Sequence, residues 1–503
     1  MSTSGIDLDG HHEETAQPAL FANRLKVYPK AVKGPVRRIK WALLVVMLGI
    51  YYILPWVRWD RGPGRPDQAL LLDMEGRRGY FFNLEIWPDE IYYLAGLLIL
   101  AAVLLFLVTS LYGRLWCGYA CPQTVWTDLF MWVERLIEGD RAERIRNDKA
   151  KLTVRKAWRK VAKHTVWLVI AALTGGAWIM YFRDAPTVTV ELLTGSASGM
   201  AYSMFALFTI TTYVLAGWAR EQVCTYMCPW PRFQAAMLDD QTVTVTYQGW
   251  RGETRGKYRK GESFEGRGDC VDCAQCVQVC PTGIDIRDGI QLECINCGLC
   301  VDACDNVMEK LHRPKSLITW DTFANQAALG RGETPKPMKL IRPRTMIYTG
   351  LIVVLGAVML TQLLTRTRVD TTLIRDRAPL FVTLSDGSIR NGYTLKITNR
   401  RVEPASFAVM VDGPEGLKAT VHLADGQELP ADDVEVRGDG VGSLRMFVSM
   451  PRAVIPEEQT PLHVTVRNQT TGEEAHVDTM FVAPPSGGDR TQRTNSVAPV
   501  QMP

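Results

Sequence analysis

Eight cysteines between Cys270 and Cys304 limit the folds open to this chain more than any other feature. They form two runs with the same C-x2-C-x2-C-x3-C spacing, namely Cys270, Cys273, Cys276 and Cys280, then Cys294, Cys297, Cys300 and Cys304. Three thiolates two residues apart can hold one face of a cubane iron–sulfur cluster only where the backbone curls tightly around it. The doubled spacing therefore predicts a small module that carries two [4Fe-4S] clusters.

The spacing also predicts which cysteines share a cluster. In runs of this kind the fourth cysteine points away from its neighbours and ligates the other cluster. We therefore expect one cluster on Cys270, Cys273, Cys276 and Cys304, and a second on Cys294, Cys297, Cys300 and Cys280. Pro281 follows the first run, whereas Asp305 follows the second; this is a variant of the usual motif, because proline is no ligand. The alternative is a pair of zinc sites, which also use C-x2-C pairs; the repeated spacing disfavours it.

The other four cysteines form two copies of a shorter motif. They lie in Cys117-Gly-Tyr-Ala-Cys121-Pro122 and Cys224-Thr-Tyr-Met-Cys228-Pro229, and both copies read C-x-Y-x-C-P. Cysteines four residues apart on one helix lie on one face, so each copy is expected to present two thiols on a helix that ends near the proline. Thiolates select Cu(I), zinc or iron–sulfur iron. We predict a metal or cofactor site; the alternative is cysteines that only pack as small apolar side chains.

Five apolar stretches are each near the roughly 20 residues that cross a bilayer as a helix. The composition of the whole 503-residue chain does not reveal these stretches. Overall, 47% of residues are hydrophobic and the mean hydropathy is close to zero, as in a soluble protein. The sequence predicts a membrane protein with a five-helix bundle. The predicted spans cover residues 39–57, 91–112, 164–182, 200–219 and 346–364.

The basic residues predict the orientation of these spans. Twelve lysines and arginines lie between residues 113 and 164, and a further basic run precedes the first span, whereas Arg183 is the only one between spans three and four. Basic loops stay in the cytoplasm. With the amino terminus inside and five spans, the carboxyl terminus is expected outside, and all twelve cysteines face the cytoplasm. The absence of any cysteine outside the motifs agrees with a reducing compartment.

The sequence after the last span changes in character. Short segments rich in Val, Thr and Phe alternate with Gly, Pro, Asn and Asp turns, which predicts an immunoglobulin-like β-sandwich over residues 370–485, without a cysteine. Residues 1–38 are predicted to be a cytoplasmic tail, and 486–503 a disordered one. His11 and His12 are expected to be solvated, with a metal site as the alternative. The remaining predicted domains are residues 39–220 with four spans, 221–345 with an α+β ferredoxin-like module at about 266–310, and the span 346–364.

Taken together, the two C-x3-C-P motifs, the doubled ferredoxin motif, the five spans and the terminal sandwich resemble the cytochrome oxidase accessory proteins called CcoG or FixG. The likeness covers roughly residues 24–485. It implies a bacterial inner-membrane iron–sulfur protein that reduces Cu(II) to Cu(I) for assembly of a cbb-type oxidase. The resemblance assigns the copper chemistry to Cys117, Cys121, Cys224 and Cys228, and the two clusters to the cysteines from Cys270 to Cys304.

The resemblance also implies partners, namely inner-membrane lipid, copper chaperones or oxidase assembly factors, the cbb-type oxidase and an electron donor that the sequence does not identify. A homodimer stays open, and no nucleic-acid partner is expected. Two alternative functions remain. One is a quinol dehydrogenase-type electron-transfer subunit, which the fifth span and the sandwich disfavour. The other is a copper-binding assembly scaffold without enzymatic activity.

Overall fold

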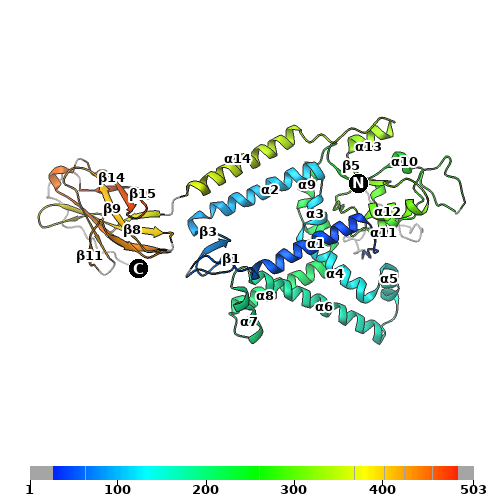
Figure 1. Cartoon of the computed structure of the whole chain (residues 1–503), viewed down its shortest axis with the longest axis horizontal. Coiled ribbons are helices and arrows are strands. Elements are labelled where there is room, and N and C mark those ends of the chain that lie inside the picture. Colours follow the sequence, from blue (N-terminus) through cyan, green and yellow to red (C-terminus); the bar gives the residue numbers. More distant parts are fainter. Residues whose placement is uncertain are drawn as a thin grey trace, which may run out of the picture. The chain divides into compact units, whose positions relative to one another are not determined.

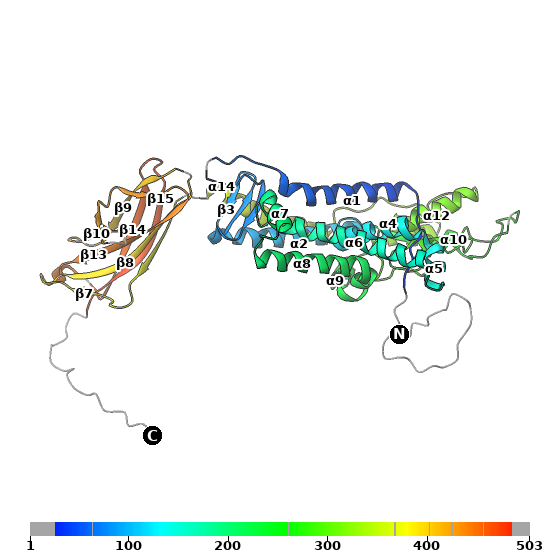
Figure 2. The same ribbon diagram turned by 90° about the horizontal axis from the view of Figure 1, so that it is seen from below.

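The computed structural model describes residues 26–484 except 63, 260, 367, 368, 402, 424, 425 and 456. The chain divides into two compact units, residues 1–359 and 360–503. Figures 1 and 2 show the first as a helical bundle with an irregular, loop-rich end, and the second as a sandwich of strands. Residues 1–25 of the predicted amino-terminal tail, with His11 and His12, and the predicted tail 486–503 lie outside the described residues.

Within the described residues, four helical segments are long and apolar enough to cross a membrane. They match predicted spans one, two, four and five, and most of their apolar side chains point outward. The first is α1 (Pro35–Ile53) with η1 (Leu54–Trp56), and the second is η2 (Pro88–Glu90) with α2 (Tyr92–Tyr112). The others are α8 (Gly199–Thr212) with η3 (Tyr213–Ala219), and α14 (Pro343–Thr365).

The third predicted span, 164–182, is not among these segments. Most of it lies in α6 (Val154–Ile179), which runs beside α4 (Pro122–Glu138) and α8. The first ten residues of α6 are strongly basic, with Arg155, Lys156, Arg159, Lys160 and Lys163. This leaves a shorter apolar part than in the other four segments. The prediction of five spans is therefore not confirmed.

The connections between these helices are more ordered than the sequence suggested. A three-stranded antiparallel meander joins α1 to α2, with β1 (Leu70–Asp73), β2 (Arg78–Phe81) and β3 (Leu84–Ile86). The predicted basic loop 113–164 contains α3 (Leu115–Tyr119), α4 (Pro122–Glu138) and α5 (Arg141–Lys149), and α7 (Ala185–Thr194) follows α6.

Two strands that pair antiparallel flank the cysteine-rich segment, one before it and one after it in the sequence. They are β4 (Thr244–Tyr247) and β5 (Ile318–Asp321), and Thr244 pairs with Asp321. Between them lie α10 (Gly249–Gly252), α11 (Gln275–Val279), η5 (Ile286–Asp288) and α12 (Leu299–Lys310). The π-helical turn η4 (Val223–Met227) and α9 (Trp230–Met237) lead into this module, and α13 (Phe323–Gly330) leads out of it to α14.

The second unit is the predicted sandwich. One sheet has the order β11-β10-β13-β8-β6 with β7 on β8, and the other has the order β12-β9-β14-β15. Along β8 every second residue from Ile389 to Asn399 is buried, as expected of a strand with one face on a core. The strands are β6 (Val369–Arg375), β7 (Val382–Thr383), β8 (Ile389–Asn399), β9 (Ala405–Asp412), β10 (Lys418–His422), β11 (Glu428–Leu429), β12 (Val434–Val436), β13 (Gly440–Met450), β14 (Gln459–Asn468) and β15 (Glu474–Val482).

A buried carboxylate ties the first membrane helix to the cysteine-rich module. Asp302, on α12, accepts the backbone N–H groups of Val36 and Arg37, at 3.2 and 2.8 Å, and so caps the start of α1. A methyl group on Gly34 would lie within 2.5 Å of this carboxylate and would displace it from the cap. The first helix therefore begins at Pro35, four residues before the predicted span, because α12 supplies its cap.

We predict that Asp302→Ala lowers the free energy of unfolding by about 1–3 kcal/mol, because it leaves two buried N–H groups without an acceptor. Thermal unfolding in detergent and hydrogen exchange at Val36 and Arg37 would measure the effect. Glu309→Ala removes an exposed acid from the same helix and is the matched control. Unchanged exchange at Val36 and Arg37 in Asp302→Ala would contradict this account of how α1 begins.

Candidate functional site

The ferredoxin-type cysteines line two adjoining cavities. Cys270, Cys273, Cys276 and Cys304 line the first, together with Tyr247 and Met308. Cys280, Cys294, Cys297 and Cys300 line the second, and Cys276 forms a wall of both. The structure thus gathers the cysteines in the two groups that the crossed ligation pattern predicts. Four thiols around each cavity are the donor set that a cubane cluster requires, so the residues present fit two such clusters.

The backbone of both runs has the curl that the spacing predicted. The residues on either side of the second cysteine of each run have positive φ angles, at Asp272 and Ala274 in the first run and at Asn296 and Gly298 in the second. A methyl group on Gly298 would lie 2.1 Å from the Trp320 ring, so this position requires glycine. Successive backbone N–H groups in such alternating conformations point toward a common anion, as at other iron–sulfur sites.

Burial makes these cavities unfavourable for bare thiolates. It is the main cause that raises the pKa of Cys276 and of Cys294 to about 12, and neighbouring thiols contribute a smaller part of the rise. The pKa of Cys300 is raised well above its ordinary value by burial and by the thiols of Cys297 and Cys294. Thiols with such pKa values lose their protons only when a cation takes the proton's place, as iron does in a cluster.

The C-x3-C-P motifs differ from the expected arrangement. Cys117 lies in α3, but Cys121 is an extended residue (φ −61°, ψ 127°) that precedes α4. Likewise Cys224 lies in η4, and Cys228 is extended (φ −80°, ψ 124°) before Pro229. The prediction that both cysteines of a motif lie on one helical face is therefore wrong. A residue before proline avoids the helical region, which forces the second cysteine off the helix.

The two C-x3-C-P motifs nevertheless come together. The pKa of Cys224 is raised to about 12, mainly by burial. The nearby thiols of Cys121, Cys117 and Cys228 raise it as well, by charge repulsion, so the four cysteines are neighbours. Burial also raises the pKa of Cys117, against the opposing charge of Arg114. We call the group of Cys117, Cys121, Cys224 and Cys228 the thiol cluster.

The thiol cluster lies against the second cavity. Cys117 and Cys224 pack on the apolar cluster that contains Ile295 and Cys297, which Cys300 also contacts. The Tyr119 hydroxyl donates to the carbonyl oxygen of Cys297 at 3.0 Å. A methyl group on Gly118 would lie 2.8 Å from the carbonyl oxygen of Ile295, so the two backbones approach closely. The tyrosine and glycine of the first motif thus hold it against the second run of cysteines.

Two residues near the thiol cluster were missed in the sequence. Gln234, on α9, is fully buried, and its Oε1 accepts from the Cys117 thiol at 3.1 Å while its Nε2 donates to Thr109 at 3.4 Å. Arg114 donates to the carbonyl oxygen of Leu292. Nothing in the local pattern marked Gln234, because an isolated glutamine in an amphipathic helix is ordinarily exposed. Arg114 was counted only as one of the basic residues.

The thiol cluster is not arranged as a finished site for one ion. Among the described residues, no group of three or more His, Cys, Asp or Glu side chains is close enough to hold a single metal ion. This agrees with the cluster cavities, because a cubane spreads its four thiolates over four irons. At the thiol cluster, the cysteine side chains would have to move closer together to bind a single ion.

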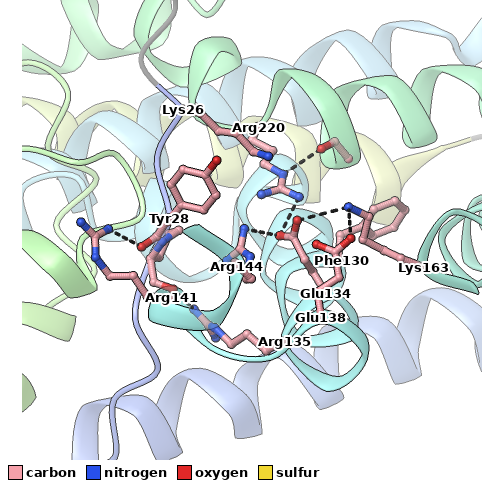
Figure 3. A network of polar contacts seen from close by, with 12 residues as sticks. Lys26, Tyr28, Phe130, Glu134, Arg135, Glu138, Arg141, Arg144, Lys163 and Arg220 are labelled. Atoms are coloured by element: carbon pink, nitrogen blue, oxygen red, sulfur yellow. Dashed lines mark hydrogen bonds and ion pairs between the residues drawn. The ribbon is translucent and has the colours of Figure 1, made fainter. Parts of the chain in front are cut away.

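A buried ionic network supports the second motif. Glu134, on α4, lies 2.6 Å from Arg144 Nη2 and 2.8 Å from Arg220 Nη2, and Lys163 bridges it to Glu138. Figure 3 shows Glu134 in the middle of these cations. Burial works to raise the pKa of Glu134, but the charges of Arg220, Arg144 and Lys163 outweigh it, so the pKa is lowered. Arg220 lies four residues before Cys224. The network binds Arg220 to α4, the helix that follows the first motif.

Comparisons with known proteins cover nearly the whole chain. A family model described as a 4Fe-4S dicluster domain matches residues 219–323, and one described as a 4Fe-4S binding domain matches residues 94–139. A third, described as an IG-like fold at the C-terminal of FixG, putative oxidoreductase, matches residues 359–484.

Three relatives align along most of their length. Protein RdxB of Cereibacter sphaeroides is 47% identical over 93% of this chain and 98% of its own. Protein RdxA of the same organism is 47% identical over 90% of this chain and 95% of its own. The nitrogen fixation protein FixG of Rhizobium meliloti is 44% identical over 96% of this chain and 97% of its own. With its ferredoxin-type domains, apolar helices and IG-like carboxyl-terminal domain, the chain belongs to the FixG family of membrane iron–sulfur proteins.

Proposed function

We propose that this chain is a cupric reductase, in which electrons held by the two ferredoxin-type sites pass to Cu(II) at the thiol cluster. The observation that carries the proposal is the packing of Cys117 and Cys224 on the apolar cluster around Cys297. The crossed groups of cysteines, with Cys270, Cys273, Cys276 and Cys304 in one and Cys280, Cys294, Cys297 and Cys300 in the other, are the proposed cluster ligands. Bound clusters would supply single electrons, the number that reduction of Cu(II) to Cu(I) requires.

The two cavities differ in their surroundings, which supports a direction for the electrons. Cys273, at the first cavity, is exposed, whereas Cys297, at the second, is buried and faces the thiol cluster. A reduced donor can therefore approach the first cavity from solvent. The second cavity meets the apolar contact with Cys117 and Cys224. We propose that electrons enter near Cys273 and leave toward the thiol cluster.

The chemistry of the thiol cluster favours the reduced product. Thiolates are soft ligands that select Cu(I). Their preference for Cu(I) over Cu(II) raises the potential of the bound copper and so favours reduction. We further propose that the clusters and the thiol cluster face the cytoplasm, because the basic segments 26–40 and 113–164 adjoin them. The sandwich would then be periplasmic, and the Cu(I) would pass to a chaperone for assembly of a cbb-type oxidase.

Anaerobic mixing of the reduced protein with Cu(II) tests the proposal. We expect cluster reoxidation, followed by visible absorbance, to match the Cu(I) trapped by a chelating dye, and both to be lost when Ser replaces the four cysteines of the thiol cluster. Reoxidation by a quinone with no response to copper would instead favour the quinol dehydrogenase alternative. Cu(I) binding without cluster reoxidation would favour the scaffold.

Iron analysis tests the assignment of the ligands. We predict about eight irons per chain in the wild type and in the quadruple Ser variant of the thiol cluster, because neither cluster uses these cysteines. Cys300→Ser should lose most of the second cluster and keep about four irons. Loss of iron in the quadruple Ser variant would mean that one or both C-x3-C-P motifs ligate an iron–sulfur cluster, which the family model over residues 94–139 allows for the first of them.

We predict that Gly118→Ala slows Cu(I) formation while the iron content stays the same. The added methyl group pushes the backbone of Ile295 and Cys297 away, at a cost of about 1–3 kcal/mol, and widens the gap that electrons cross. Stopped-flow mixing with Cu(II) measures the rate. Gly249→Ala, where a methyl group meets open space, is the control. Equal rates in the two variants would show that electrons do not leave by this contact.

We predict that Gln234→Leu weakens Cu(I) binding about fivefold, because one hydrogen bond that fixes the Cys117 thiol is lost. Competition with a Cu(I) chelator measures the affinity. Gln222→Leu, which removes a half-buried amide beside the second motif, is the control. An affinity equal to that of the wild type in Gln234→Leu would show that this amide does not position the thiol for copper.

A further inference from the structure

A basic cavity of about 310 Å³ lies between α5 and the start of α6, apart from the cysteines. Its cationic lining residues are Arg146, Arg155, Lys156, Arg159 and Lys160, and its acidic ones are Glu138, Glu143 and Asp148. The size is at the lower end of the range for sites that bind small ligands. The lining is too polar for an apolar ligand, so the chemistry of its charges decides what it can bind.

Two of the three acids are already paired with lysines. Glu138 lies 2.9 Å from Lys163, as Figure 3 shows. Asp148 accepts from Lys26 at 2.5 Å, from Lys160 at 3.2 Å and from the Tyr28 hydroxyl at 2.8 Å. The remaining acid, Glu143, is exposed and folds back over Gly139. The acids therefore leave most of the arginine charge at the cavity uncompensated.

The arginines of the cavity have no partner in the part of the chain that the structure describes. Arg146, Arg155 and Arg159 form no hydrogen bond or ion pair there through their side chains, whereas Lys156 donates to the carbonyl oxygen of Ala150 at 2.6 Å. Arg155 and Arg159 are one turn apart on α6, so they lie on one face. A planar guanidinium binds phosphate oxygens in pairs, which makes three of them a phosphate-binding set.

An apolar stripe runs along the neighbouring face of the same helix. Val154, Trp158 and Val161 are 89%, 71% and 57% exposed, and their spacing of four and three residues places them on one face. Leu168, also exposed, continues this face into the apolar half of α6. A helix with a basic face beside an exposed apolar face that includes tryptophan is suited to the boundary between lipid headgroups and acyl chains.

We propose that this cavity binds the phosphate headgroup of an anionic phospholipid, whose acyl chains lie along the stripe of Val154, Trp158, Val161 and Leu168. A free phosphate shares the headgroup chemistry but has no apolar part, so the stripe favours the lipid. Basic pockets beside membrane helices are known binding sites for anionic headgroups. Bound lipid would hold α5 and the start of α6 to the membrane surface, and this role is independent of the copper chemistry.

The test uses the full-length protein in detergent, with dioleoylphosphatidylglycerol, dioleoylphosphatidylcholine or inorganic phosphate as the added probe. Native mass spectrometry counts retained lipid, and thermal unfolding measures the stabilisation. We expect retention and a raised Tm with phosphatidylglycerol only. The variant R146Q/R155Q/R159Q should bind it roughly a hundredfold more weakly, at about fivefold for each arginine. The control R377Q/R437Q/R452Q makes the same charge change at exposed arginines of the sandwich and should bind like the wild type.

Each other outcome overturns the proposal. Equal binding of the two lipids would show that the headgroup charge does not determine binding. Binding by R146Q/R155Q/R159Q equal to that of the wild type would place the lipid elsewhere. A Tm raised as much by phosphate as by phosphatidylglycerol would assign the cavity to a free phosphate. Cluster absorbance reports whether each variant is folded. If the triple variant fails to fold, R155Q and R159Q are measured singly against R377Q, with the same two readouts.

Discussion

Three buried carboxylates join the first membrane helix, α4 and the cysteine-rich module to their neighbours. Asp128 and Glu134 on α4 and Asp302 on α12 are each no more than 2% exposed. A charge at such depth is strongly unfavourable unless it is paired, so each acid fixes the elements that supply its partners. Asp128 binds Arg37 through both carboxylate oxygens, at 2.9 and 2.7 Å, and Asp302 caps the start of the same helix. Helix α1 is thus held from two sides, and the helix after the first C-x3-C-P motif is held with it.

That frame brings the thiol cluster to the second cavity. The first motif ends at Pro122, where α4 begins, and α4 carries Asp128 and Glu134, so the acids that fix α4 also fix Cys121. The second motif is fixed in the same way through Arg220, which binds Glu134. The two motifs are far apart in the sequence, yet one helix with two buried acids positions both of them.

The local chemistry of the site could be predicted from the sequence. The effect of each proline on the cysteine before it could have been predicted as well. The spacing of the eight ferredoxin-type cysteines predicted both their grouping and the curl of the backbone around them. The expected helical face of each C-x3-C-P motif was wrong, although the reason is local: Cys121 and Cys228 each precede a proline and must leave the helix. Cys280 precedes Pro281 and is extended as well, with ψ 124°.

The tertiary pairing could not be predicted from one sequence. Residues 113–164 were interpreted as a basic loop, but Arg144 and Lys163 are buried against acids of the same segment, and nothing local tells a buried arginine from an exposed one. The count of five spans is not confirmed for a related reason, because α6 combines a basic half with an apolar half. The alternating pattern of the sandwich, by contrast, follows from strand geometry alone, and its prediction was confirmed.

The proposed function depends on the binding of copper at the thiol cluster beside the second cavity. X-ray absorption at the copper edge, on the reduced protein loaded with one equivalent of copper, tests it most directly. We expect Cu(I) with sulfur ligands, and loss of these ligands when Ser replaces Cys117, Cys121, Cys224 and Cys228. A spectrum with only nitrogen and oxygen ligands, or one that the Ser replacements leave unchanged, would contradict it.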